Sequence, residues 1–149
     1  MPTFRIDLLD VGNPALVEAS VELLVSAFTN SERYGAKRLR EELRANSGLF
    51  YRRFFVATEA RDIIGVGGVK AADWASHTHL LYLSAVAQEQ RGQGIGQALV
   101  KARVKWVEQN FKTGRILVSS TKGKRFRDLG FVEVRKSAIE GRHLMMLRF

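Results

Sequence analysis

Apolar side chains recur at strand spacing in some parts of the chain and at helical spacing in others, and each change of spacing predicts an element boundary. Asn13 and Pro14 have the residue types of a helix N-cap and a first helical position. A turn at residues 60–62 between two apolar runs predicts a hairpin. The predicted strands are residues 4–9, 54–59, 63–71, 80–86, 115–119, 131–136 and 143–148. The predicted helices are residues 14–28, 35–46, 95–110 and 122–129.

This order of elements has hairpins early and a strand–helix–strand unit in the middle, which predicts a mixed-sheet α/β or α+β domain. The 149 residues leave room for one domain, so a single domain over residues 1–149 is expected. The absence of cysteine excludes disulfides, thiolate metal sites and a cysteine nucleophile. His77 and His79 have no third ligand at a recognisable spacing, so a turn or an edge strand is expected for them and no metal.

Apolar runs stay well below the roughly 18 residues of a membrane-spanning helix, and the opening residues do not resemble a signal peptide. No contact with a membrane is therefore expected, and the cytoplasm is the expected location.

The net charge of +9 is unevenly distributed. Residues 91–149 carry fourteen basic and four acidic side chains, whereas residues 1–32 carry one basic and five acidic ones. A positive field near the C-terminal part favours an acidic ligand or partner there, and a basic surface that only aids solubility is the other interpretation. Glutamates of the N-terminal third could form a local patch for a cationic amine: Glu18, Glu22, Glu32, Glu41 and Glu42.

The most informative segment is the loop between the most apolar predicted strand and the helix at residues 95–110. Its three glycines allow backbone conformations closed to other residues and let N–H groups approach a ligand. Because those groups open a helix, the free donors and the helix dipole favour an anion. Arg91 adds a forked guanidinium that suits phosphate. The loop predicts a phosphate-bearing cofactor.

Two common phosphate motifs do not match this segment. A dinucleotide fingerprint, G-x-G-x-x-G, fails because Gln97 or Leu99 stands at the position of the third glycine, depending on the register. A Walker A loop fails at Gly123-Lys124 because Arg125 follows where Ser or Thr is required.

The run R-G-Q-G-I-G at residues 91–96 resembles the acetyl-CoA signature R-x-x-G-x-G of the GCN5-related N-acetyltransferases, the GNAT family. A second, weaker likeness is F-R-D-L-G-F at residues 126–131, which is similar to that family's F-Y-x-x-x-G-F segment. Length and element order extend the resemblance over nearly the whole chain. It implies the acyl-CoA N-acyltransferase fold, with a central, mostly antiparallel sheet, a splayed strand pair and flanking helices.

The resemblance also implies roles for particular residues. Backbone N–H groups of the loop would hold the CoA pyrophosphate: Arg91, Gly92, Gln93, Gly94, Ile95 and Gly96. A bulge at Ser84, Ala85 and Val86 would expose strand backbone to the pantetheine arm, and the N–H near Ser84 would polarise the thioester carbonyl. Lys124 and Arg125 are candidates for the CoA 3′-phosphate, with an acidic acceptor, RNA or a solvated helix face as alternatives.

Two positions depart from the family pattern. Phe126 stands where many members have a tyrosine that protonates the leaving thiolate, and Leu80 stands where some have a glutamate base. By the two-residue strand period, Tyr82 shares a face with Leu80 and Ser84. Tyr82 is therefore the remaining candidate for a catalytic proton relay, with a core tyrosine as the alternative.

The leading hypothesis is an acetyl-CoA-dependent N-acetyltransferase that acts on a primary amine of a small molecule, a peptide or a protein. A non-catalytic CoA-binding sensory domain is the second hypothesis, and a basic RNA-associated protein is the third. Nucleic acid is not expected as a partner, because the sequence has neither an RNP aromatic pattern nor a zinc-ligand spacing. The sequence leaves a homodimer open.

Overall fold

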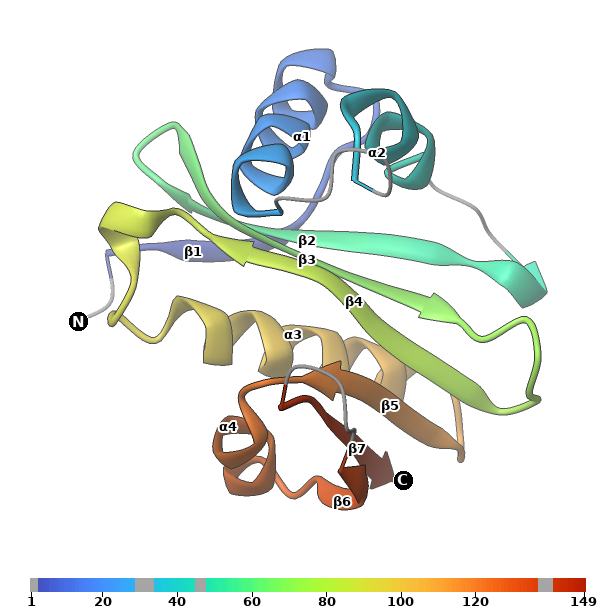
Figure 1. Cartoon of the computed structure of the whole chain (residues 1–149). Helices are drawn as coiled ribbons and strands as arrows, with labels where there is room; N and C mark the ends of the chain where they lie inside the picture. The colour runs from blue at the N-terminus through green and yellow to red at the C-terminus, as the bar shows by residue number, and fades with distance from the viewer. Residues whose placement is uncertain (1–2, 29–33, 45–47, 137–140) are drawn as a thin grey trace.

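The computed structural model describes residues 3–28, 34–44, 48–136 and 141–149. Within them, seven strands form one sheet in the order β1-β2-β3-β4-β5-β7-β6, with helices on both faces (Figure 1). The strands are β1 (Arg5–Leu8), β2 (Arg52–Glu59), β3 (Asp62–Ala71), β4 (Thr78–Val86), β5 (Arg115–Ser120), β6 (Val132–Lys136) and β7 (His143–Arg148). The helices are α1 (Pro14–Ala27), α2 (Ala36–Glu42), α3 (Ile95–Asn110) and α4 (Gly123–Asp128), with short 3-10 turns η1 (Gly48–Phe50) and η2 (Gln88–Gln90).

The described strand pairs are antiparallel except β4 and β5, which pair in parallel. The predicted order of elements and the mixed-sheet class are therefore confirmed. Helix α2 ends at Glu42, so it is shorter than the predicted helix at residues 35–46. The last predicted residues of that helix, with Ser47, lie outside the described part.

Helices α1 and α2 cover one face of the sheet (Figure 1). The predicted N-cap is confirmed, because the Asn13 side chain accepts hydrogen bonds from the N–H groups of Ala15 and Leu16 at 3.1 and 3.3 Å. Arg40 of α2 binds both carboxylate oxygens of Glu18 on α1. Glu18, one of the five glutamates predicted to form a patch for a cationic amine, is therefore already paired with a cation. The core on this face consists of Leu9, Val21, Leu24, Leu39, Leu43, Phe54, Val56, Val66 and Ala85.

Helices α3 and α4 pack on the opposite face, against a larger core that includes Phe55, Val69, Ile116 and Met145. The side chains of α3 that are buried there are Ile95, Leu99, Val100, Arg103 and Val107. The sheet is therefore sandwiched between two layers, and both β3 and β4 contribute to each core.

His79 lies inside this second core, in the part of β4 that pairs with both neighbours, so the expectation of a turn or an edge strand is wrong for this residue. For His77, which lies in the turn before β4, the expectation is confirmed. Its ring is 3% exposed, and its Nδ1 shares a hydrogen bond of 2.6 Å with the Tyr51 hydroxyl. The Phe111 ring lies 4.4 Å away, centroid to centroid. Burial, and secondarily the nearby His77, lowers the pKa of His79. The imidazole is therefore held neutral in the folded protein.

We expect this buried ring to make the protein sensitive to mild acid. The unfolded chain binds a proton at an imidazole pKa of about 6.5, whereas the folded chain does so only at lower pH. The free energy of unfolding is therefore not reduced by this group above about pH 6.5, and it decreases as the pH falls below that value, because the unfolded chain then binds the proton preferentially. Melting temperatures of the wild type and His79→Leu between pH 7.5 and 5.0 test this. Melting temperatures that fall equally with pH in the two proteins would contradict this expectation.

Candidate active site

Strands β4 and β5 separate after a short parallel contact. They pair only at Thr78–Arg115, His79–Ile116 and Leu80–Leu117. Beyond that point β4 continues to Val86 and β5 to Ser120, and Figure 1 shows the two strands diverging. From Leu81 onward, the described part of the chain provides no strand partner for this edge of β4. An extended ligand can therefore pair with its free backbone groups.

A β-bulge lies in this unpaired stretch of β4. Tyr82 pairs with Gly68 and Ala85 with Val66, so β4 has one residue more than β3 between these pairs. Leu83 takes a φ of +49°, a left-handed conformation that is uncommon for a residue with a branched side chain. The bulge thus lies at Leu83 and Ser84, earlier than the predicted range of residues 84–86.

The bulge also corrects the predicted strand parity. Tyr82 and Ala85 are three residues apart, yet both pack in the core under α1 and α2. The two-residue period that placed Tyr82 and Ser84 on one face does not continue through Leu83. Ser84 is exposed, and it is the second residue of the bulge.

The loop after β4 opens helix α3. Gly94 is the N-cap with a φ of +81°, and Gly92 has a φ of +86°, both values that favour glycine. A Cβ added at either position would have no atom within 4 Å, so open space adjoins the loop. In the described part of the chain, the first hydrogen bond of the helix runs from the Ala98 N–H to the Gly94 carbonyl. The N–H groups of the first turn therefore remain available to an anion.

Two neighbouring basic residues of α4, Lys124 and Arg125, point to different places. A Cβ at Gly96 would lie 2.6 Å from Nη1 of Arg125, so this guanidinium lies directly over the first turn of α3. Lys124 instead points to Asp128, with 3.5 Å between Nζ and Oδ2. Arg91 is exposed within the loop itself. Among these predicted phosphate ligands, the structure brings Arg91 and Arg125 to the loop and turns Lys124 toward a neighbour on its own helix.

Tyr82 connects the bulged strand to helix α2. Its hydroxyl donates a hydrogen bond of 2.6 Å to Oε2 of Glu42. Burial, followed by the hydrogen bond to Glu42, raises the pKa of Tyr82. The phenol therefore stays protonated and holds the carboxylate of Glu42 in place. Sequence reasoning missed this pair, because 40 residues separate its two members.

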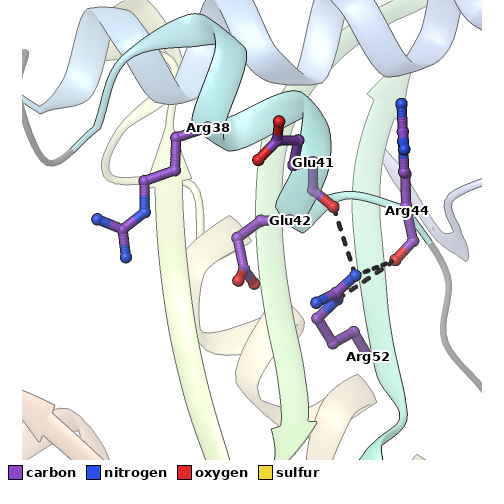
Figure 2. Close-up of a pocket in the computed structure, with 5 residues that line it drawn as sticks. All are labelled: Arg38, Glu41, Glu42, Arg44 and Arg52. Carbon is purple, nitrogen blue, oxygen red and sulfur yellow. Dashed lines mark hydrogen bonds between the residues drawn. The ribbon is translucent and has the colours of Figure 1, made fainter.

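Glu42 also lines a hollow of about 470 Å³ between α2 and the start of β2, together with Arg38, Glu41, Arg44 and Arg52 (Figure 2). The guanidinium of Arg52 donates to the backbone carbonyls of Glu41 and Arg44 at 3.3–3.4 Å, which fixes its orientation. The hollow is thus connected through Tyr82 to the bulge in β4. Of the glutamates singled out from the sequence, Glu41 and Glu42 are here, and Glu32 lies outside the described residues.

Arg103 of α3 supports the same region from the opposite face. It is 1% exposed, and its Nη1 donates a hydrogen bond of 2.9 Å to the carbonyl of Gly68, the partner of Tyr82 in the register. A Cβ at Gly67 would lie 2.8 Å from its Cζ, so a side chain there would displace the guanidinium. Among the described residues no carboxylate pairs with Arg103. Burial accordingly lowers its pKa.

The two positions that depart from the family pattern hold purely structural side chains. Phe126 is 5% exposed, and its ring packs edge-on against Phe131 with 5.3 Å between centroids. Leu80 forms the last pair of β4 with β5. Neither can accept or donate a proton. The described residues contain no cluster of three or more metal-ligating side chains, and none of their helices is long and apolar enough to cross a membrane.

Comparison with known proteins agrees with this geometry. The family model described as "Acetyltransferase (GNAT) domain" matches residues 50–133, the part of the chain that contains β2 to β5, the glycine loop and α3. The chain therefore belongs to the GNAT acetyltransferase family. A comparison with curated proteins gave no match.

Solved structures share the fold over nearly the full chain. Escherichia coli ElaA has a TM-score of 0.77 at 12% identity, covering 96% of this chain and 97% of its own. Aminoglycoside 6′-acetyltransferase type Ii has a TM-score of 0.76 at 20% identity, covering 96% of each chain. The PaiA N-acetyltransferase of Thermoplasma acidophilum, in complex with coenzyme A, has a TM-score of 0.73 at 15% identity, covering 99% of this chain and 100% of its own. These likenesses confirm the acyl-CoA N-acyltransferase fold.

Proposed function

We propose that this protein is an N-acetyltransferase that moves an acetyl group directly from acetyl-CoA to a primary amine. The observation that carries the proposal is the bulged end of β4, which diverges from β5 immediately before a glycine loop that opens α3. The complex of a fold relative with coenzyme A supports the choice of ligand. The cytoplasmic location stays a prediction from the sequence, which leaves a homodimer open.

Acetyl-CoA supplies an activated acetyl thioester, and the chain provides three kinds of contact for it. The loop N–H groups, with Arg91 and Arg125, would bind the pyrophosphate. The free edge of β4 at Ser84, Ala85 and Val86 would pair with the pantetheine amides. A backbone N–H released by the bulge near Ser84 would donate to the thioester oxygen as it becomes negative.

The acceptor enters as an ammonium ion, which must lose a proton before it can attack. We assign that proton to the carboxylate of Glu42, which Tyr82 holds in place. The amine nitrogen then forms a bond to the acetyl carbon, and the carbon–sulfur bond breaks. The second proton of the nitrogen passes to the departing thiolate, so the products are the acetamide and free CoA thiol, with one proton released from Glu42 to water.

A non-catalytic CoA-binding domain is the second candidate, and the burial of Phe126 and the identity of Leu80 favour it. The two candidates differ in turnover. We expect CoA thiol release from acetyl-CoA to rise well above the amine-free rate with at least one of a set of alkylamines, amino acids, peptides and aminoglycosides. Tight CoA binding without turnover on any amine would overturn the transferase and leave the sensory domain.

Arg125 and Lys124 provide a matched test of phosphate binding. We expect Arg125→Ala to weaken CoA binding at least about tenfold, because a guanidinium hydrogen-bonded to phosphate contributes roughly 1.5–3 kcal/mol. The loss should shrink at high salt. Lys124→Ala, the same charge change one residue away, should have little effect because its Nζ points to Asp128. Calorimetry with CoA measures both variants. The same loss in Arg125→Ala with dephospho-CoA is expected if the guanidinium binds the pyrophosphate, and a smaller loss would assign it to the 3′-phosphate. Equal losses for the two variants would remove Arg125 from the site.

A further inference from the structure

The hollow beside α2 contains charges of both signs that do not neutralise one another. In the described part of the chain, none of its five charged side chains forms an ion pair with another charged side chain. Their side-chain hydrogen bonds run from Tyr82 to Glu42 and from Arg52 to backbone carbonyls. Charged groups of opposite sign that line one hollow without pairing remain available to a ligand that carries both charges.

The carboxylate and guanidinium groups occupy distinct positions in this hollow. Glu42 is tied to Tyr82 and so lies on the side of the β4 bulge. Arg52 is held by the carbonyls at the end of α2, which leaves its Nη1 group without a partner among the described residues. Figure 2 shows Arg38 on one side of Glu42 and Arg52 on the other, while the Arg44 side chain extends away from Glu42. The Arg38 guanidinium has no hydrogen-bond or ion-pair partner among the described residues. Because Arg52 is already held by backbone carbonyls, the available cation at a distance from Glu42 is Arg38.

Electrostatics agree with this arrangement. The positive charge of Arg52 lowers the pKa of Tyr82, whereas the negative charge of Glu42 raises it. Both groups therefore lie within electrostatic range of the same phenol. Including Lys70, whose Nζ lies 4.5 Å from the centre of the Tyr82 ring, the cations around the hollow outnumber its carboxylates. A simple alkylamine or a polycation would meet this excess of positive charge, whereas an anionic group on the acceptor would be attracted.

We propose that the acceptor is an amine that also carries a carboxylate, with the ammonium group at Glu42 and the carboxylate at Arg38. Guanidinium groups suit carboxylates because their forked donors match the two oxygens. This inference rests on the proposed acetyl transfer and names the class of its acceptor. The glutamate of the ammonium subsite is the same group that takes the proton, so binding and deprotonation occur at one place.

The test compares ω-amino acids of three to six carbons with n-alkylamines of equal length, as acceptors of acetyl from acetyl-CoA. We expect the amino acid of best length to have a kcat/KM at least about tenfold above that of its alkylamine, the worth of one charge-assisted hydrogen bond. Arg38→Gln should reduce that ratio several-fold. Lys37→Gln removes the same charge from the neighbouring position, which does not line the hollow, and should leave the ratio unchanged.

Each outcome has one meaning. Alkylamines accepted as well as amino acids, or a ratio equally reduced in both variants, would overturn the carboxylate subsite while acetyl transfer stands. Acetyl-CoA binding in calorimetry without turnover on either series would overturn the transferase, and the acceptor class with it. A ratio that falls in Arg38→Gln and persists in Lys37→Gln supports the subsite.

Discussion

Replacing Gly94 by aspartate is expected to weaken acetyl-CoA binding about a hundredfold, because a carboxylate within about 4 Å of a phosphate in a partly desolvated site costs a few kcal/mol. The new side chain would project into the open space beside the loop, where a Cβ has no atom within 4 Å. Isothermal calorimetry with acetyl-CoA measures the loss. Circular dichroism and the melting temperature establish that the variant is folded.

Gly94→Asn is the matched control for this experiment. Asparagine has nearly the shape of aspartate and tolerates a left-handed backbone better than most residues, so the strain of a φ of +81° is similar in the two variants. Only the charge differs. We expect Asn to bind acetyl-CoA clearly more tightly than Asp. A folded Gly94→Asp protein with wild-type affinity would place the pyrophosphate elsewhere.

Glu42→Gln is expected to lower kcat about a hundredfold and to leave the affinity for acetyl-CoA nearly unchanged, since positioned acid–base groups contribute roughly 10²–10⁴-fold. Glutamine keeps a hydrogen-bond acceptor for the Tyr82 hydroxyl but cannot take the ammonium proton. Activity should recover as the pH rises, because more of the acceptor is then present as free amine. Steady-state rates between pH 7 and 10 measure both effects.

Two further variants serve as controls for Glu42→Gln. Tyr82→Phe removes the hydrogen bond that holds Glu42 and should lower kcat by less, about tenfold, without weakening acetyl-CoA. Glu22→Gln removes a carboxylate from the exposed side of α1 and should leave the rate unchanged. If Glu42→Gln lowered the rate by the same factor at every pH, the carboxylate would not be the proton acceptor.

The local parts of this account could be predicted from the sequence. Asn13-Pro14 specifies the start of α1 through a short-range cap, and the spacing from Ile95 to Val107 specifies α3. The loop from Arg91 to Gly96 could be assigned to an anion because its glycines and its place before a helix act locally. Such features depend on residues a few positions apart, and their chemistry is visible in the order of amino acids.

The parts that could not be predicted depend on contacts across the fold. Nothing in the run around Leu83 signals a left-handed residue, because the bulge is set by pairing with Gly68 and Val66 of β3. Arg103 is four residues from both Leu99 and Val107 and lies with them on the buried face of α3, although a charged side chain favours solvent. The glycine at position 67 that makes room for it is 36 residues away. The Tyr82–Glu42 pair likewise joins distant elements.

Direct transfer to an amine can be measured with acetyl-CoA that carries a ¹³C-labelled acetyl group. The protein is incubated with this donor and an accepted amine, and the intact protein and the small molecules are then analysed by mass spectrometry. The account predicts labelled acetamide in amounts matching the CoA thiol released, with no label on the protein under conditions of turnover. Label recovered only as free acetate, or as a stable acetyl group on the protein, would contradict it.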